Sequence, residues 1–168
     1  MAKRPAYGDT DCSVARTLAV IGDRWTMLIL RNALHGMRTF DAFQEHLDIS
    51  PSVLSDRLST LTKAGVFDRR QSASDGRSFE YRLTEKGLDL YPVIVALMDW
   101  GDKWEPSEKG ERLRLIERAT GKKIRGAIVL SQDGKALRPQ DVTPLLGPAA
   151  ADDVRQLVEG DWRGRAKR

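Results

Sequence analysis

The stretch ISPSVLSDRLSTLTKAGVFDRR, residues 49–70, decides the fold of this chain. Ser50 followed by Pro51 is a strong helix start, because Pro has no N–H to lose in the first turn and its backbone angle already suits a helix. Gly65 is a typical helix stop. The stretch therefore predicts a helix over residues 51–64 and a change of structure directly after it.

This predicted helix has two different faces. A narrow apolar stripe, which must pack on a core, is formed by Leu54, Leu58 and Leu61. The opposite face has short polar side chains where Glu and Lys are usual: Ser52, Ser55, Asp56 and Ser59. Such side chains let a helix approach the major groove of DNA and bond to phosphates and base edges. The alternative interpretation is a solvated face that binds nothing.

The neighbouring elements complete a known order. Apolar residues at helical intervals predict three helices before the quoted stretch: 13–22, 24–34 and 40–47. A strand, a turn with Asp75-Gly76 and a second strand are predicted over 66–83, followed by a helix over 84–104. This order is that of a winged helix-turn-helix, so the predicted fold class is α+β, mostly α.

The composition changes in the last third of the chain. Three segments have the pattern of short strands: 112–119, 123–131 and 135–139. Turns at Gly121 and Gly134 separate them, and a short helix at 149–159 is predicted before a basic end. We expect a winged helix-turn-helix domain for DNA binding and dimerisation over 1–106, and a small β-rich extension over 107–168.

Arginines gather on or near the predicted wing, where they can meet phosphates or the minor groove: Arg69, Arg70, Arg77 and Arg82. Each arginine alone is an ordinary surface charge, but together with the order of elements they favour DNA. The predicted DNA-binding residues are Arg38, Thr39, Ser50, Ser52, Val53, Ser55, Asp56, Arg57, Ser59, Lys63, Arg70 and Arg77. The competing hypothesis is a winged-helix module that binds protein without binding DNA.

Composition excludes several classes of function. A net charge of +4 and a pI near 9.4 permit a polyanionic partner without requiring one. The single cysteine excludes an intrachain disulfide, and with His35 and His46 on different elements it cannot form a Cys/His zinc site. No nucleophile arrangement surrounds Cys12 and no Gly-rich phosphate loop exists, so we predict no enzyme, catalytic residue, metal or cofactor.

The location of the protein is also predicted from apolar patterning. No apolar run approaches the roughly 20 residues that a membrane span needs. The first residues, MAKRPAYGD, lack the apolar core of a signal peptide. We therefore expect a cytoplasmic, nucleoid-associated protein with no membrane partner.

Six stretches carry a resemblance to a known family: CSVARTL (12–18), IGDRWTMLILR (21–31), RTFDAFQ (38–44), ISPSVLSDRL (49–58), EYRLTEKG (80–87) and ALMDWGDKW (96–104). In this order they resemble the HxlR family of bacterial and archaeal transcriptional regulators, which are relatives of MarR-type winged helices. The resemblance implies a homodimer that binds an inverted repeat near a promoter. It makes helix 51–64 the recognition helix and hairpin 66–83 the wing.

The resemblance further implies that terminal helices, including 84–104, form the dimer interface. Trp100 and Trp104 lie four residues apart on one helix face, and we assign them to that interface with Leu97. Alternatively, these tryptophans could line an effector pocket with Tyr91 and Met98. The predicted partners are double-stranded DNA, a second copy of the chain and a small-molecule effector.

Cys12 is the predicted redox-sensing residue, because some relatives look like sensors of oxidants or electrophiles through a cysteine at its position. The start of a helix and Arg16 one turn later favour the thiolate, while Asp9 and Asp11 oppose it. The motif reads Cys-Ser-Val where the family pattern has Cys-Pro-Val, and an inert thiol is the alternative. Some family tails carry Cys and His pairs near turns like those at Gly121 and Gly134, and the absence of such pairs here excludes a metal site in the extension.

Overall fold

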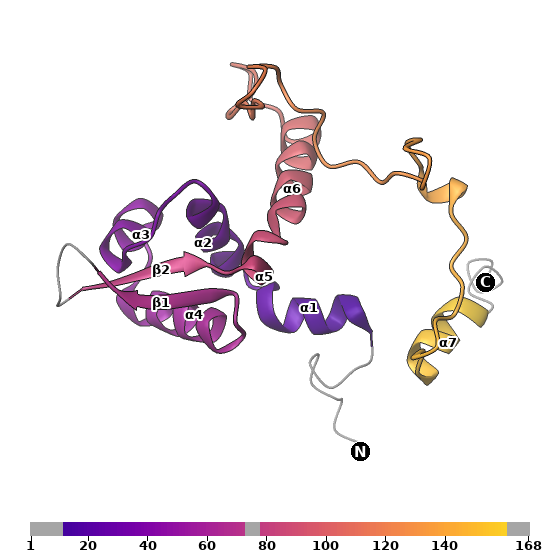
Figure 1. Cartoon of the computed structure of the whole chain (residues 1–168), viewed down its shortest axis with the longest axis horizontal. Helices are drawn as coiled ribbons and strands as arrows, with labels where there is room; N and C mark the ends of the chain where they lie inside the picture. The colour runs from indigo at the N-terminus through magenta and orange to yellow at the C-terminus, as the bar shows by residue number, and fades with distance from the viewer. Residues whose placement is uncertain (1–11, 73–77, 161–168) are drawn as a thin grey trace.

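The structure is a computed structural model that describes residues 12–72 and 78–160 (Figure 1). Its elements are α1 (Ser13–Ile21), α2 (Arg24–Leu34), α3 (Phe40–Leu47), α4 (Pro51–Lys63), β1 (Phe67–Gln71), β2 (Phe79–Leu83), α5 (Glu85–Leu88), α6 (Tyr91–Trp104), the 3-10 helix η2 (Pro139–Asp141) and α7 (Asp152–Glu159). Figure 1 shows α2, α3, α4 and the hairpin as one body, from which α1 and α6 project in different directions. The predicted winged helix-turn-helix, mostly α with a small antiparallel sheet, is confirmed.

Local sequence signals explain where the first helices begin and end. Asp23 caps α2, since its Oδ1 accepts hydrogen bonds from the backbone N–H groups of Trp25 (3.0 Å) and Thr26 (3.3 Å). Thr39 caps α3 in the same way through the backbone N–H of Ala42 at 3.3 Å. Asp48 turns the chain between α3 and α4 with a φ of 49°, a left-handed conformation that Asp tolerates better than most residues.

The core lies between α2, α3, α4 and the first strand. The predicted stripe of α4 is buried, and its three leucines have no exposed surface. The other largest fully buried side chains are Ile29, Leu30, Phe43, Val66 and Phe67. The rings of Phe43 and Phe67 lie 6.4 Å apart between centroids, so α3 and β1 are joined through aromatic contact.

The wing is an antiparallel pair in which Phe67 faces Leu83 and Gln71 faces Phe79. The outer edge of β2 is covered by the residues that precede α3. The backbone N–H of Tyr81 donates to the carbonyl of Arg38 at 2.7 Å, and an isolated bridge joins residues 39 and 80. The wing therefore contacts the helix-turn-helix through both strands, by the aromatic contact of β1 and by the backbone hydrogen bond of β2. The predicted Asp-Gly turn lies outside the described residues.

The prediction of one continuous helix over 84–104 is wrong, because the structure has two helices there, α5 and α6. Thr84 caps α5 as expected, with its hydroxyl accepting from the backbone N–H of Gly87 at 3.2 Å. Pro92 explains the break, since it has no N–H to donate to the carbonyl four residues earlier and its ring clashes there. It is instead accommodated in the first turn of a new helix.

The strands predicted in the extension are also corrected. Among residues 107–160, backbone pairing is limited to isolated bridges between Ile116 and Lys123 and between Leu130 and Ala136. The turns at Gly121 and Gly134 are present, with φ of 67° and 76°. A lone hairpin with no layer packed on it is marginal, which explains why pairing does not propagate. Figure 1 shows this segment running away from the body to α7, which is shorter than predicted.

None of the helices in the described part of the chain combines the length and apolarity needed to cross a bilayer.

Candidate DNA-binding surface

The face of α4 opposite its leucines is open to solvent, as its side-chain pattern predicts. The exposed residues on it include Ser52, Ser55, Asp56, Ser59 and Lys63. Val53 and Arg57 on the flanks are half-buried. The structure thus presents a row of short polar side chains, with one lysine in the last turn, on a helix held by its buried side.

A groove of about 390 Å³ lies between α4 and the wing. It is lined by Ser55, Ser59, Thr62, Lys63, Arg69 and Tyr81. Arg69 lies two positions after the buried Phe67 along β1, so both side chains point to the α4 side of the sheet. Its guanidinium carbon lies 3.5 Å from the ring centroid of Phe79, which orients the cation by stacking. α4 and the wing therefore share one polar, positively charged groove.

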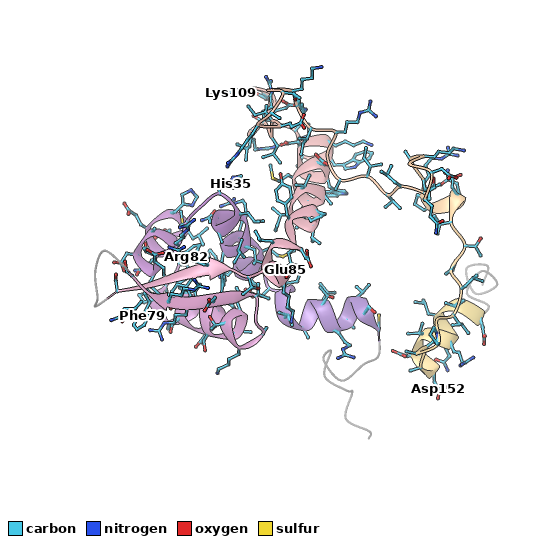
Figure 2. All side chains as sticks on the ribbon, viewed as in Figure 1. His35, Phe79, Arg82, Glu85, Lys109 and Asp152 are labelled. Carbon is cyan, nitrogen blue, oxygen red and sulfur yellow. The ribbon has the colours of Figure 1, made fainter. Side chains whose placement is uncertain are left out.

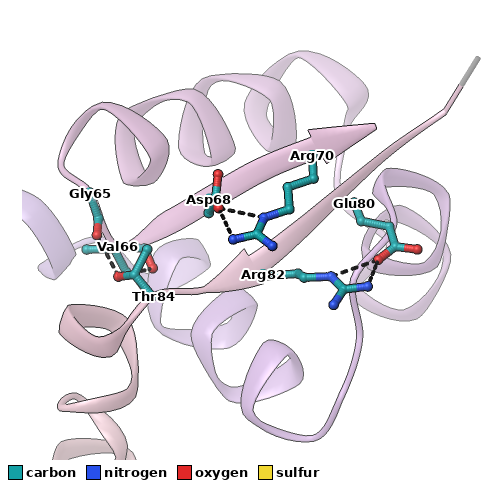
Figure 3. Close-up of polar contacts among 7 residues, drawn as sticks. All are labelled: Gly65, Val66, Asp68, Arg70, Glu80, Arg82 and Thr84. Atoms are coloured by element: carbon teal, nitrogen blue, oxygen red, sulfur yellow. Dashed lines mark hydrogen bonds and ion pairs between the residues drawn. The ribbon is translucent and has the colours of Figure 1, made fainter. Parts of the chain in front are cut away.

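The outer face of the wing is different, because its arginines are neutralised (Figure 3). Arg70 Nη2 lies 2.6 Å from Asp68 Oδ2, and Arg82 Nη2 lies 2.8 Å from Glu80 Oε2. The strand register places Asp68 opposite Arg82 and Arg70 opposite Glu80, so the four charges alternate in sign. The hydrogen bond from Arg82 lowers the pKa of Glu80 and keeps it ionised. Arg70 and Arg82 are therefore paired within the wing, and their contact with DNA stays a prediction.

Other predicted contact residues have internal partners. Arg57 Nε lies 3.0 Å from Asp23 Oδ1, without the alignment of a hydrogen bond, and this ion pair ties α4 to the cap of α2. The hydroxyl groups of Ser50 and Ser52 lie 3.4 Å apart at the start of α4. Arg38 is exposed beside the cap of α3. Their roles toward DNA stay predictions, as does that of Arg77, which lies outside the described residues.

Sequence reasoning grouped Arg69 with the wing arginines but left it out of the predicted contact residues, and it did not consider Thr62 or Tyr81. A signal for Arg69 was present, since a residue two positions after a buried Phe67 points to the same side of a strand. Thr62 uses its hydroxyl hydrogen internally, donating to the carbonyl of Leu58 at 2.7 Å. The position of Tyr81 depends on strand register, which the sequence alone did not establish.

The predicted interface residues of α6 are exposed in the single chain. Leu97 is 50% exposed, and Trp100 and Trp104 are each 60% exposed. On α1, Val14 and Leu18 are also exposed, at 66% and 49%. Large apolar side chains on two projecting helices are unusual for a surface that meets only water.

Trp100 and Trp104, proposed for the alternative effector pocket, are exposed in the part of the chain that the structure describes, so that pocket stays a prediction. Tyr91 is also exposed. Of Tyr91, Met98, Trp100 and Trp104, only Met98 lines a described cavity.

Cys12 stands immediately before α1, where it is the N-cap residue. It is half-buried, and its side chain makes no capping hydrogen bond. Its carbonyl accepts a hydrogen bond from the backbone N–H of Arg16 at 3.0 Å. The thiol therefore has no structural task in the cap.

Comparisons with known proteins agree with this arrangement. The uncharacterized HTH-type transcriptional regulator Rv3095 of Mycobacterium tuberculosis is 40% identical over 136 residues, which are 81% of this chain and 86% of that protein. The crystal structure of PA1607, described as a transcription factor, has 36% identity and a TM-score of 0.76 and covers 82% of this chain and 96% of its own. The redox regulator HypR in its oxidized form has 29% identity and a TM-score of 0.50, covering 55% of this chain and 96% of its own.

The family assignment follows directly. A model described as HxlR-like helix-turn-helix matches residues 20–109, which include α2, the helix-turn-helix, the wing and α6. The chain belongs to the HxlR-like helix-turn-helix family and is a transcriptional regulator of that type.

Proposed function

We propose that this regulator binds an inverted-repeat operator as a homodimer, with α4 in the major groove and the wing beside it. The observation that carries the proposal is the groove in which the short polar face of α4 meets Arg69. Short side chains permit close approach to base edges, while an arginine oriented by a ring supplies a phosphate contact. Such a regulator acts in the cytoplasm on nucleoid DNA.

A dimer is part of this proposal. One recognition helix buries too little surface for tight specific binding, and two-fold symmetry doubles the contacts. The exposed apolar faces of α6 and α1 supply the interface, with Leu97, Trp100 and Trp104 at its centre. The two half-sites should then lie about one helical turn, near 10 bp, apart. We propose that 1–106 forms this binding and dimerisation unit and that 107–168 is an appended part.

The test is selection of bound sequences from a random duplex library. Enrichment of an inverted repeat with half-sites near 10 bp apart supports the proposal. No enrichment, together with no salt-sensitive binding of random DNA at low salt, contradicts it and favours the protein-binding module.

Arg69→Ala should weaken binding to all duplexes about equally and lower the salt slope of log K by about one, because one phosphate contact is lost. Arg70→Ala is the matched control, since it removes the same charge from the next position of β1. Its guanidinium is already held by Asp68 through Nε at 2.7 Å, so the effect should be smaller. Fluorescence anisotropy across a salt series measures both. A larger loss for Arg70→Ala than for Arg69→Ala would show that the phosphate contact lies on the outer face.

We also propose that Cys12 modulates DNA binding when oxidised or alkylated. The thiol is half-buried at the start of α1, beside the proposed dimer surface. HypR, a redox regulator of similar fold, provides a parallel. Because the chain has one cysteine, a disulfide must join two subunits or take up a small thiol.

The effect of oxidation is expected to depend on Cys12. Treating the wild type with a quinone or peroxide should change its affinity for the selected operator, whereas Cys12→Ser should not respond. Anisotropy before and after treatment measures this, and dithiothreitol should reduce a disulfide back to the free thiol but should not remove a quinone adduct. Equal responses of the two proteins would make Cys12 a structural residue.

A further inference from the structure

A cleft of about 870 Å³ lies outside the DNA-binding groove, between α2, α3, α6 and the first residues of the extension. Its volume falls in the range of small-molecule sites. Figure 2 shows His35, one of its lining residues, at the end of α2 on the side that faces α6. The cleft is open on one side, and its walls come from α2, α3, α6 and the extension.

One end of this cleft is polar and internally ordered. Asn32, which is only 4% exposed, accepts with its Oδ1 from Arg31 Nε at 3.0 Å and from Arg31 Nη2 at 2.8 Å. Since Arg has no acceptor, this contact fixes the amide with its Nδ2 toward His46 Nδ1, 3.0 Å away. The imidazole Nδ1 must then accept, which places the ring hydrogen of neutral His46 on Nε2.

Arg31 is the cation of this cleft that has no carboxylate partner among the described residues. It uses two of its five donors on Asn32, and within residues 12–72 and 78–160 it forms no ion pair with a carboxylate. The other arginine in the lining, Arg112, has Asp102 at 3.3 Å. With that pair neutral, the cleft presents about one net positive charge at pH 7, which suits a monoanion better than a dianion.

The remaining walls are apolar. Met37 and Ala42 line one side, while Met98 of α6 and Leu113 of the extension line the other. Methionine adapts its shape to different apolar groups, so two methionines facing one cleft suit a bulky organic body. A buried polar end and an apolar body are the ordinary features of a site for an amphipathic small molecule.

We propose that this cleft binds a small organic monocarboxylate, with the carboxylate on the free donors of Arg31 and an apolar body between Met37, Met98 and Leu113. The planar fork of arginine matches a carboxylate, and such charge-assisted bonds are stronger than neutral ones. Because the walls belong to α2, α3 and α6, occupancy couples the helix-turn-helix to the proposed dimer helix. This regulatory consequence rests on the proposed function, whereas the binding itself does not.

The test is isothermal titration calorimetry of the full chain, without DNA, using 4-phenylbutyrate and its uncharged amide, 4-phenylbutyramide. The carboxylate should bind saturably and at least about tenfold more tightly than the amide. Arg31→Gln should remove this ratio, while Arg155→Gln, an exposed arginine on α7 far along the chain, should retain it. Since no DNA is present, failure here is distinguishable from failure of the DNA-binding proposal.

A second variant fills the cleft without touching its charges. Gly101 lines the cleft, and a Cβ built there meets no atom within 4 Å, so Gly101→Phe adds bulk without a clash at Cβ. Gly101→Phe should weaken the binding of both compounds. Its circular dichroism spectrum should match that of the wild type, which would show that the variant is folded. Absence of saturable binding, equal affinity for acid and amide, or a ratio unchanged in Arg31→Gln would each overturn the proposal.

Discussion

Trp100→Glu is expected to convert the proposed dimer to a monomer at micromolar concentration. Trp100 is 60% exposed in the single chain, near the middle of the apolar face that also holds Leu97 and Trp104. In a two-fold interface each substitution occurs twice, and each places a carboxylate in a desolvated contact. We expect the dimer dissociation constant to rise at least about 100-fold. Sedimentation velocity over a concentration series measures it.

Leu145→Glu is the control for this experiment. Leu145 is 86% exposed but belongs to the extension, away from α1 and α6, so its substitution should leave the dimer intact. Trp100→Glu should also lose specific operator binding, while retaining weak, salt-sensitive binding to random DNA. If Trp100→Glu sediments as the wild-type dimer does, the interface lies on another surface.

Leu58→Ala is expected to lower the free energy of unfolding by about 2–5 kcal/mol, because it leaves a cavity in the core. Leu58 has no exposed surface and lies on the buried side of α4, directly behind the proposed reading face. This loss is a large part of the roughly 5–15 kcal/mol that stabilises an ordinary domain. Urea denaturation followed by circular dichroism measures it.

The matched control is Leu157→Ala on α7. The same side chain is removed from a helix, but Leu157 is 65% exposed, so the change should stay within about 0.5 kcal/mol. Comparable losses in the two variants would mean that α7 packs as a core element. At temperatures where Leu58→Ala remains folded, its DNA affinity should be near that of the wild type, since no groove residue is altered.

The helix-turn-helix could be predicted from the sequence because its signals are local. Ser50-Pro51 and Gly65 bound α4 to within one residue, and its leucine spacing identifies the buried face. Asp23 and Thr39 cap the two preceding helices by the hydrogen bonds that such residues usually form. Predicting these helices requires no information about residues that are distant in the chain.

Other features depended on contacts that a local pattern does not contain. The ion pair of Arg57 with Asp23 joins residues far apart in the chain. The strands expected in the extension had suitable alternation, but a strand also needs a neighbour and a covering layer. The break between α5 and α6 could have been predicted from Pro92, and the Asp-x-Arg spacing of Asp68 and Arg70 already indicated an ion pair within the strand.

The edges of the wing have a further consequence, for self-association. The outer edge of β2 is occupied by the chain around Arg38, which leaves β1 as the strand whose backbone can accept another strand. The hairpin also carries aromatic side chains, which would favour cross-β stacking if the strands were uncharged. Asp68, Arg69 and Arg70 stand in a row on β1, and charged edge strands resist edge-to-edge pairing. The charge on β1 thus opposes strand addition between two copies of the regulator, an effect that is independent of DNA.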